Sequence, residues 1–318
     1  MSIYKDLEPT EFDEIKTYEL DSRPSKVAIS EFSRAIDEND TLNGFLNKLP
    51  NILAVRSMRE LAFRIRNARD SKHPVIWGIG GHVVKTGLSP IFNDLMDRGF
   101  VTAIAVNGSV LVHDTEIAMV GFTSEDVDAS LGEGDFGAAR ETGELLNRAA
   151  ASGRENGTGL GEAMCAEITA INPKYRDYSI LCKSYDLQIP VTAHLTIGAD
   201  IGHFHSSANG ADLGETSHKD FKLFCTTVRK MNGGGVYINY GSAVTLPEIF
   251  LKAITVNRNL GYEIRNITTA NFDFIQHYRP NTNVVKRPTA NGAGKGFAIT
   301  GHHELTLPLL AAQILTQS

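Results

Sequence analysis

Short apolar runs that alternate with helical segments constrain the fold of this chain more than any other feature. The run at 74–78 leads into a segment that starts with Ser89-Pro90 and stops at Gly99, which are typical helix start and stop signals. The next apolar run covers 101–106, so these pieces have the length of one strand–helix–strand unit. Further strands are predicted at 189–193, 235–239, 262–267 and 297–300, and helices at 29–48, 57–70, 179–185, 219–231, 247–257 and 305–315. This alternation predicts an α/β fold with a parallel sheet that is covered by helices on both faces.

We expect one domain that carries an arm. The 318 residues are enough for one large domain or two small ones. Residues 1–25 are polar, contain Pro9 and Pro24, and are expected to form an N-terminal arm that either packs on another subunit or stays loose. Residues 26–318 are expected to form a single domain, with a flexible surface excursion at 151–161.

Composition and charge exclude several classes of protein. The formal net charge is −6 and no run of Lys and Arg is present, so nucleic acid is not an expected partner. No stretch approaches the ~20 apolar residues of a membrane span, and the acidic start is unlike a secretory signal, so a cytoplasmic protein is expected. Three widely spaced cysteines without a CxxC pair predict neither a disulfide framework nor a structural zinc site.

The loops after the strands are where a parallel sheet binds ligands. The loop at 78–87 is rich in glycine and leaves backbone N–H groups free for an anion. It is neither a GxGxxG fingerprint, because Val83 breaks the spacing, nor a Walker A loop, because Val84 stands where glycine is needed. A tight strand–helix turn explains it equally well. In the next loop, His113 followed by Asp114 could form an oriented base, or a surface histidine beside a helix carboxylate.

Histidines gather in two further loops. His203 and His205 could ligate zinc, line a polar pocket or be structural, and without a tighter pattern no metal site is predicted. The loop at 300–304 opens the last helix, whose free N–H groups could hold a phosphate or a ribose. Polar loops at successive strand ends together favour a ligand crevice.

Taken in order, these loops resemble deoxyhypusine synthase, particularly its archaeal forms. The similar segments are Gly81-His-Val-Val-Lys-Thr-Gly-Leu88, Asp94-Leu-Met-Asp-Arg-Gly-Phe100, Asn107-Gly-Ser-Val-Leu-Val-His-Asp114, Ile189-Pro-Val191 with Gly202, Gly233-Gly-Gly-Val236, Thr269-Ala270, Phe272-Asp273, Arg279-Pro280 and Leu307-Pro-Leu-Leu-Ala311. The resemblance implies a Rossmann-like, NAD-binding domain that forms homotetramers with active sites at subunit interfaces. The NAD contacts that it implies are Gly81, His82, Lys85, Thr86, Asn107, Gly108, Ser109, Thr269, Ala270, Gly301 and His302.

The chain departs from that family at positions that carry its chemistry. The family's imine-forming lysine lies in a Trp-Gly-Lys motif, whereas Lys286-Arg287-Pro288 aligns there, with proline at the lysine position. His203 replaces the Asp that would bind the substrate amine, Asn239 replaces a histidine, and His302 replaces an Asp of the NAD site. Because a polycation is bound by carboxylates, spermidine is not the expected substrate.

The resulting expectation is an NAD-dependent enzyme that acts on a small polar or anionic substrate. The predicted site residues are His113 and Asp114 as the base, His203, His205 and Asn239 as polar groups of the site, and Arg279 with Lys286 as an anion clamp. Four alternatives stay open: a genuine deoxyhypusine or homospermidine synthase that uses Lys286, an NAD-dependent ornithine cyclodeaminase-like enzyme, a non-catalytic nucleotide-binding sensor, and a metal hydrolase. The cyclodeaminase alternative follows from a fainter resemblance of one loop, which contains His113, Asp114 and Glu116.

Overall fold

The structure, a computed structural model, describes residues 3–132 and 134–316. Within these ranges six strands form one sheet, with the order β3-β2-β1-β4-β5-β6. All neighbouring strands run parallel. The strands are β1 (Val75–Ile79), β2 (Ala103–Asn107), β3 (Val191–His194), β4 (Val236–Tyr240), β5 (Thr268–Asp273) and β6 (Lys295–Thr300). The predicted α/β fold with a parallel sheet is therefore confirmed.

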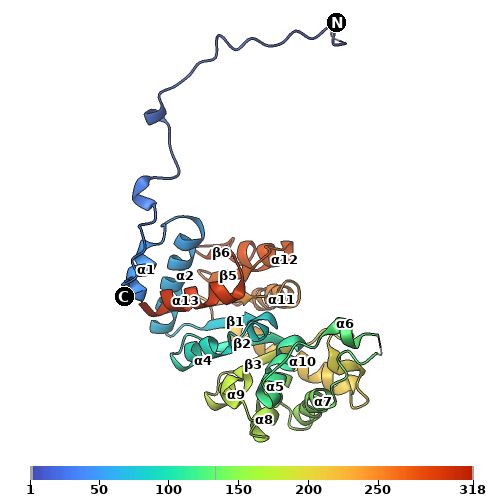
Figure 1. The fold of residues 1–318 in the computed structure, drawn as a ribbon. Coiled ribbons are helices and arrows are strands. Elements are labelled where there is room, and N and C mark those ends of the chain that lie inside the picture. Colours follow the sequence, from blue (N-terminus) through green and yellow to red (C-terminus); the bar gives the residue numbers. More distant parts are fainter. Residues whose placement is uncertain (1–2, 133, 317–318) are drawn as a thin grey trace.

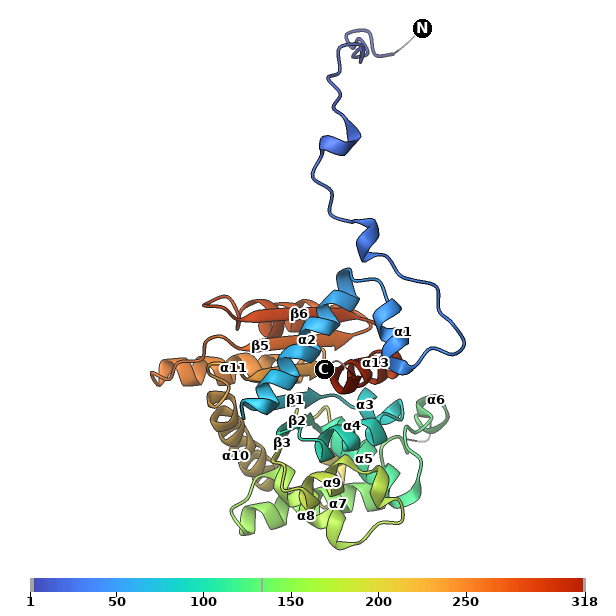
Figure 2. The same cartoon turned by 90° about the vertical axis from the view of Figure 1, so that its left-hand side faces the viewer.

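Helices cover both faces of the sheet (Figures 1 and 2). On one face α2, α4, α5 and α13 pack on buried side chains such as Trp77 and Ile104, and on the other α10, α11 and a π-helix pack on Ile76 and Tyr237. The α-helices are α1 (Leu42–Lys48), α2 (Leu53–Asp70), α3 (His82–Lys85), α4 (Ser89–Asp97), α5 (Gly108–Val120), α6 (Val127–Ser130), α7 (Arg140–Glu155), α8 (Leu160–Ala170), α9 (Ile180–Asp186), α10 (Gly210–Arg229), α11 (Thr245–Asn259), α12 (Tyr278–Pro280) and α13 (His303–Thr316). The π-helix is η5 (Asn281–Lys286), and the 3-10 helices are η1 (Leu20–Ser22), η2 (Ile29–Glu31), η3 (Arg176–Tyr178) and η4 (Ile201–Phe204).

The N-terminal segment extends far from the sheet (Figures 1 and 2). All of residues 3–30 are exposed, and many of them are large and apolar, for instance Phe12, Ile15 and Tyr18. Backbone hydrogen bonds to the rest of the chain begin at Glu31, whose carbonyl accepts from Asn51 N at 2.8 Å. The extended stretch is thus longer than the predicted arm.

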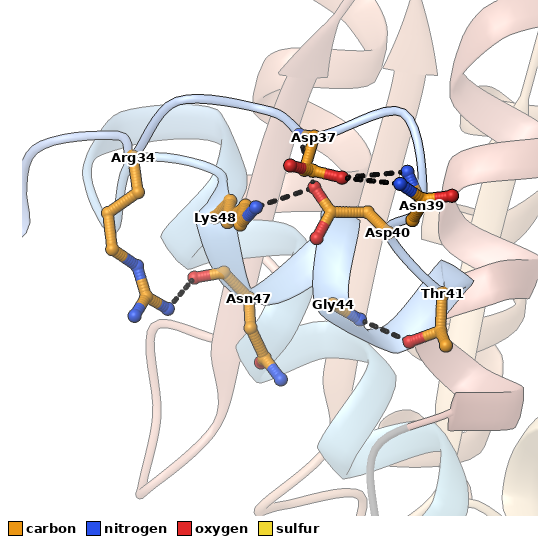
Figure 3. A network of polar contacts seen from close by, with 8 residues as sticks. All are labelled: Arg34, Asp37, Asn39, Asp40, Thr41, Gly44, Asn47 and Lys48. Carbon is orange, nitrogen blue, oxygen red and sulfur yellow. Dashed lines mark hydrogen bonds and ion pairs between the residues drawn. The ribbon is translucent and has the colours of Figure 1, made fainter.

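The helix predicted over 29–48 is wrong for most of its length, because polar side chains bond to the local backbone instead (Figure 3). Asp37 Oδ1 accepts from Asn39 N at 2.9 Å, and Asp40 Oδ2 accepts from Asp37 N at 2.8 Å and from Lys48 Nζ at 2.7 Å. Thr41 then caps α1, since its Oγ1 accepts from Gly44 N at 3.1 Å. Short polar side chains of this kind compete with helical hydrogen bonding and favour turns and caps.

Two further predictions need correction. The strand expected at 262–267 lies instead at Thr268–Asp273. The apolar pattern did not indicate this strand, because polar Thr and Asn side chains form its buried centre. The surface excursion expected at 151–161 is mostly helical, since α7 runs to Glu155 and α8 starts at Leu160.

A buried carboxylate joins three elements beyond the β3 edge of the sheet. Asp220 of α10 is fully buried, and its Oδ2 accepts from Gly161 N at 2.7 Å, at the start of α8, and from Ala193 N at 2.8 Å, in β3. Burial raises the pKa of Asp220 to about 7, against the effect of these hydrogen bonds.

Among the described residues, no helix has both the length and the apolar character needed to cross a bilayer.

Candidate functional site

The centre of the carboxyl edge is closed by contacts between glycines. A Cβ on Gly80, after β1, would lie 2.1 Å from the carbonyl oxygen of Gly241, after β4. A Cβ on Gly81 would lie 2.1 Å from Ser109 Oγ and 3.1 Å from His113 Cδ2. Because β1 and β4 flank the point where the strand order reverses, these close contacts lie at the place where such sheets bind ligands.

A cavity of about 250 Å³ lies next to this point, over the ends of β2 and β3. Its size suits a small metabolite. Its polar lining consists of Lys85, Ser109, His113, Glu116, Ser124, Glu125 and Asp200. Three carboxylates face one lysine, so the cavity is acidic rather than basic.

His113 projects from α5 and is held by a neighbouring hydroxyl. Its Nδ1 lies 2.7 Å from Thr123 Oγ1 and 3.8 Å from Glu116 Oε2. Thr123 in turn donates to Glu116 Oε2, and Thr142 Oγ1 donates to Glu116 Oε1 at 3.4 Å. Burial alone would raise the pKa of Glu116, but the nearby His113 and the hydrogen bond from Thr123 hold it below its ordinary value. Glu116 is therefore an ionised group beside a histidine.

Asp114, predicted as the partner of His113, points elsewhere. Its carboxylate is fully buried and accepts from Ser179 Oγ at 2.5 Å and from Ile180 N at 2.7 Å, at the start of α9. Burial raises the pKa of Asp114 to about 6, although these hydrogen bonds act in the opposite direction. The expected His113–Asp114 pair is thus replaced by a His113–Thr123–Glu116 group, and Asp114 fastens α9 to α5.

The start of α5 is already occupied by side chains of the protein. Asn107 caps the helix, since its Oδ1 accepts from Val110 N at 3.3 Å. Asp200 lies against Gly108, where a Cβ would come within 2.4 Å of its Cγ, and its Oδ2 accepts from Thr196 N at 2.9 Å. Burial raises the pKa of Asp200. Of the NAD contacts implied on this loop, Gly108 and Ser109 line the cavity, whereas the Asn107 side chain caps the helix.

A group of rings lies across the switch point, at the ends of β5 and β6. The ring centroid of His82 lies 5.8 Å from that of His303 and 6.2 Å from that of Phe274, which also stacks on His302 at 6.2 Å. His82, Phe274 and His302 are exposed, whereas His303 is buried, and burial lowers its pKa. Next to them, Gly301 N donates to Asp273 O at 3.1 Å and Thr86 Oγ1 donates to His82 O at 2.7 Å. The structure thus brings His82, Thr86, Gly301 and His302 to one edge.

Three predicted site residues lie inside the sheet instead. Thr269 and Ala270 are fully buried in β5, because that strand begins after the predicted one. Asn239 is fully buried in β4, where its Nδ2 donates to Ser242 O at 2.8 Å and to Asn271 Oδ1 at 2.7 Å. The structure therefore does not bring these three side chains to the ligand edge.

His203 and His205, in the loop after β3, do not point toward a common metal site. His203 Nδ1 accepts from Gly198 N at 3.1 Å, while His205 Nε2 lies 3.0 Å from Gly137 O and its ring stacks on Phe204. Both follow Asp200 in or next to η4 rather than on a strand, so the spacing expected for a strand does not apply. Over the described part of the chain, no group of three or more His, Cys, Asp or Glu side chains is arranged to hold a metal ion.

The predicted anion clamp is not formed at the cavity. Arg279, in α12, is half exposed, with its Nε 3.5 Å from Glu248 Oε1. Lys286 is exposed at the end of η5, and the preceding Val285 lies against Gly296 at the start of β6, where a Cβ would come within 2.0 Å of the Val285 carbonyl oxygen. Lys286 thus lies toward the opposite edge of the sheet, which gives no support to an imine-forming role for it.

Sequence reasoning missed Thr123 and Glu125 as lining or positioning groups of the cavity. Both belong to the segment between α5 and α7, where no periodic pattern indicates which side chains turn inward. Asp200 was noticed in the histidine-rich loop, but only as a possible metal ligand and not as a lining residue of the cavity.

The strand order and the close glycine loops at the switch point define a doubly wound α/β fold. This fold is shared with deoxyhypusine synthase-like proteins. A protein assigned as a deoxyhypusine synthase from Entamoeba histolytica has a TM-score of 0.53 at 10% identity, over 88% of this chain and 95% of that one. The predicted resemblance is thus confirmed for the fold.

Two other solved structures have similar folds and are much longer. ArgZ, an arginine dihydrolase from the ornithine–ammonia cycle in cyanobacteria, has a TM-score of 0.52 at 16% identity, over 84% of this chain and 34% of ArgZ. AgrE, in a ternary complex with ornithine and NAD+, has a TM-score of 0.54 at 17% identity, over 81% of this chain and 32% of AgrE. This chain therefore spans about a third of each. No family model and no curated protein matches the sequence.

The residues at this edge fit a nicotinamide dinucleotide. Gly81 is buried against Ser109, and no space is left there for a side chain of its own. Exposed rings of His82, Phe274 and His302 offer flat surfaces on one side of the switch point, and the cavity lies on the other. Lys85 lies in the cavity wall, where a phosphate or a carboxamide could reach it.

Proposed function

We propose that this protein is an NAD-dependent enzyme that oxidises a small polar substrate carrying an amine, bound in the acidic cavity. The observation that carries the proposal is the cavity itself, where His113 lies beside the switch point and lines the wall together with Glu116, Glu125 and Asp200. An anionic substrate, the other expectation, would meet three carboxylates there. A cationic amine is attracted by them instead.

Four of the cavity residues have a stated role in this proposal. Glu125 and Asp200 would hold the substrate amine, and Ser109 would orient it against the β1 loop. His113 would take a proton from the amine, since general bases contribute when they lie within hydrogen-bond reach of the proton. NAD, when bound, supplies a hydride acceptor. The complex of AgrE with ornithine and NAD+ is consistent with amine chemistry on this fold.

Cofactor binding is the first test. At about 100 times its Kd, NAD should stabilise the folded protein by about 2.7 kcal/mol, and a shift of the thermal midpoint by several degrees should follow in differential scanning fluorimetry. The matched control is Gly81→Ala, whose Cβ would displace Ser109, so its shift should be much smaller. The proposal is abandoned if neither NAD nor NADH shifts the midpoint of the wild-type protein.

The exposed arm supports a further part of the proposal, that the protein is a homo-oligomer, with the homotetramer implied by the family resemblance as the expected state. Large exposed apolar side chains on an extended segment are typical of surfaces that another chain covers, and Phe12, Ile15 and Tyr18 are each exposed in the single chain. The cytoplasmic location stays a prediction.

Replacing Phe12, Ile15 and Tyr18 together by serine should weaken the oligomer while leaving the domain folded, because these side chains lie outside its core. Analytical ultracentrifugation over a concentration series would measure the change, with circular dichroism as the check on folding. The control is serine in place of Asp6, Glu8 and Glu11 of the same segment, which should leave the oligomer intact. An identical oligomer in both triple variants would contradict the role of the arm.

A further inference from the structure

Thr123 bonds to two functional groups at once, although it lies outside every helix and strand. Its hydroxyl is 2.7 Å from His113 Nδ1 and also donates to Glu116 Oε2. Seven residues separate it from Glu116 and ten from His113, so the return of the chain after α5 brings it back onto that helix. Nothing in the fold of α5 itself requires this contact.

The hydroxyl has a single proton, and this decides the state of His113. An ionised carboxylate can only accept hydrogen bonds, and the lowered pKa of Glu116 keeps it ionised near neutral pH. The Thr123 proton must therefore point at Glu116. The oxygen of Thr123 is then left to accept, so the proton of a neutral His113 ring must be on Nδ1, and Nε2 carries the lone pair.

The free nitrogen lies on the side of the ligand site. The Cδ2 edge of the ring, which adjoins Nε2, is the part that approaches Gly81, where a Cβ would come within 3.1 Å of Cδ2. His113 also lines the cavity, and 16% of its side chain is exposed. Since the two nitrogens of an imidazole ring point away from each other, Nε2 is directed away from Thr123, and we place it on the side of the cavity that His113 lines.

The group that holds Thr123 is itself anchored. Gly121, at the end of α5, has a φ of 84° and leaves no space for a side chain beside the Tyr175 ring. Glu125 Oε2 accepts from Gly137 N at 2.8 Å, which ties the two ends of the segment together. Both oxygens of Glu116 are bonded, one to Thr123 and one to Thr142. The hydrogen-bonded group of His113, Thr123 and Glu116 therefore has little freedom to rearrange.

We infer that Thr123 is a positioning residue that fixes the proton of His113 on Nδ1 and presents Nε2 to the cavity as the base. The inference deepens the proposed function, since it assigns the proton that the oxidation must release. The N–H bond of the substrate amine breaks and its proton goes to Nε2. The electron pair left on the nitrogen would form the C=N bond. NAD, held by groups such as His82 and His302, would supply the acceptor for the hydride that leaves the neighbouring carbon.

The state of the ring can be measured without cofactor or substrate. In ¹⁵N NMR spectra of the histidine-labelled full-length protein, the two nitrogens of a neutral imidazole resonate far apart, and coupling to the ring protons tells them apart. Wild-type His113 is expected to have its proton on Nδ1. Thr123→Val removes the acceptor while keeping the shape, so a mixture of both tautomers is expected. Thr123→Ser keeps the hydroxyl and should restore the wild-type spectrum.

Turnover gives a second readout, on the substrate identified by screening. Thr123→Val should lower kcat about 10-fold, with KM little changed, and Thr123→Ser should recover most of it. A wild-type His113 with its proton on Nε2 overturns the inference, and so does a Thr123→Val protein with the wild-type tautomer. Because these spectra need no NAD, they separate failure of this inference from failure of the proposed function, which the binding test alone decides.

Discussion

Replacing His113 by glutamine is expected to lower the turnover number about 10²–10⁴-fold, the usual contribution of a general base. The glutamine can still reach Thr123, but its amide cannot take up a proton from the substrate. NAD affinity should change much less than turnover, because the rings of His82 and His302, which are among the proposed cofactor contacts, lie across the switch point from His113. Steady-state kinetics together with isothermal titration of NAD would separate the two effects.

His218→Gln is the matched control for this prediction, since His218 is exposed on α10 and lies outside the cavity lining. It should behave as the wild type in both measurements. If His113→Gln retained full turnover, the base would have to be sought elsewhere in the cavity, with Glu116 or Asp200 as the remaining acceptors. A parallel loss of NAD affinity would instead indicate that the variant distorts the β1 loop near Gly81.

Asp220 should make the protein less stable as the pH rises from about 4 to about 7. Its pKa is raised from 3.8 to about 7 by burial in the folded chain. Between these values the folded state keeps a proton that the unfolded state has released, so stability falls by about 1.4 kcal/mol per pH unit, or about 4 kcal/mol in all. Below 3.8 both states are protonated, and above about 7 both are ionised.

Asp220→Asn isolates this contribution, because the amide does not titrate and still offers an oxygen to Gly161 or Ala193. The free energy of unfolding, from urea titrations at several pH values, should be compared between the two proteins. The wild-type value minus the value for the variant should decrease as the pH rises across this window and be constant above it. A difference that increases with pH would show that the hydrogen bonds to the carboxylate outweigh its burial.

The sheet was predicted well because buried parallel strands consist mostly of apolar residues. Trp77 and Ile104 belong to such runs, and both strands lie where the pattern indicated. The pattern failed for β5, since Thr269 and Asn271 look like loop residues until the facing Asn239 is known to bond to Asn271 in the buried sheet. Local hydrogen bonding by Asp37 and Asp40 likewise overrode the apolar spacing that favoured a long helix.

The loops that form the candidate site could be predicted from the sequence, but the residues that bond to one another within it could not. The glycine loop at Gly81 and His113, as a candidate base, were both singled out from the sequence, and the structure brings these two residues together. The partner of His113 was assigned to the adjacent Asp114, but neighbours on a helix point about 100° apart, and Glu116 is on the same side at i+3. Thr123 reaches that side only because the chain folds back, which no spacing rule indicates.

The contact between Gly80 and Gly241 also offers a way to recognise other chains of this kind. Since even a methyl group on residue 80 would overlap the opposing carbonyl, the two halves of the sheet can touch here only as bare main chain. A homologue with alanine or anything larger at that position must hold its halves further apart. Screening genomes for glycine at both places would therefore separate proteins with a sealed junction from those with a wider one.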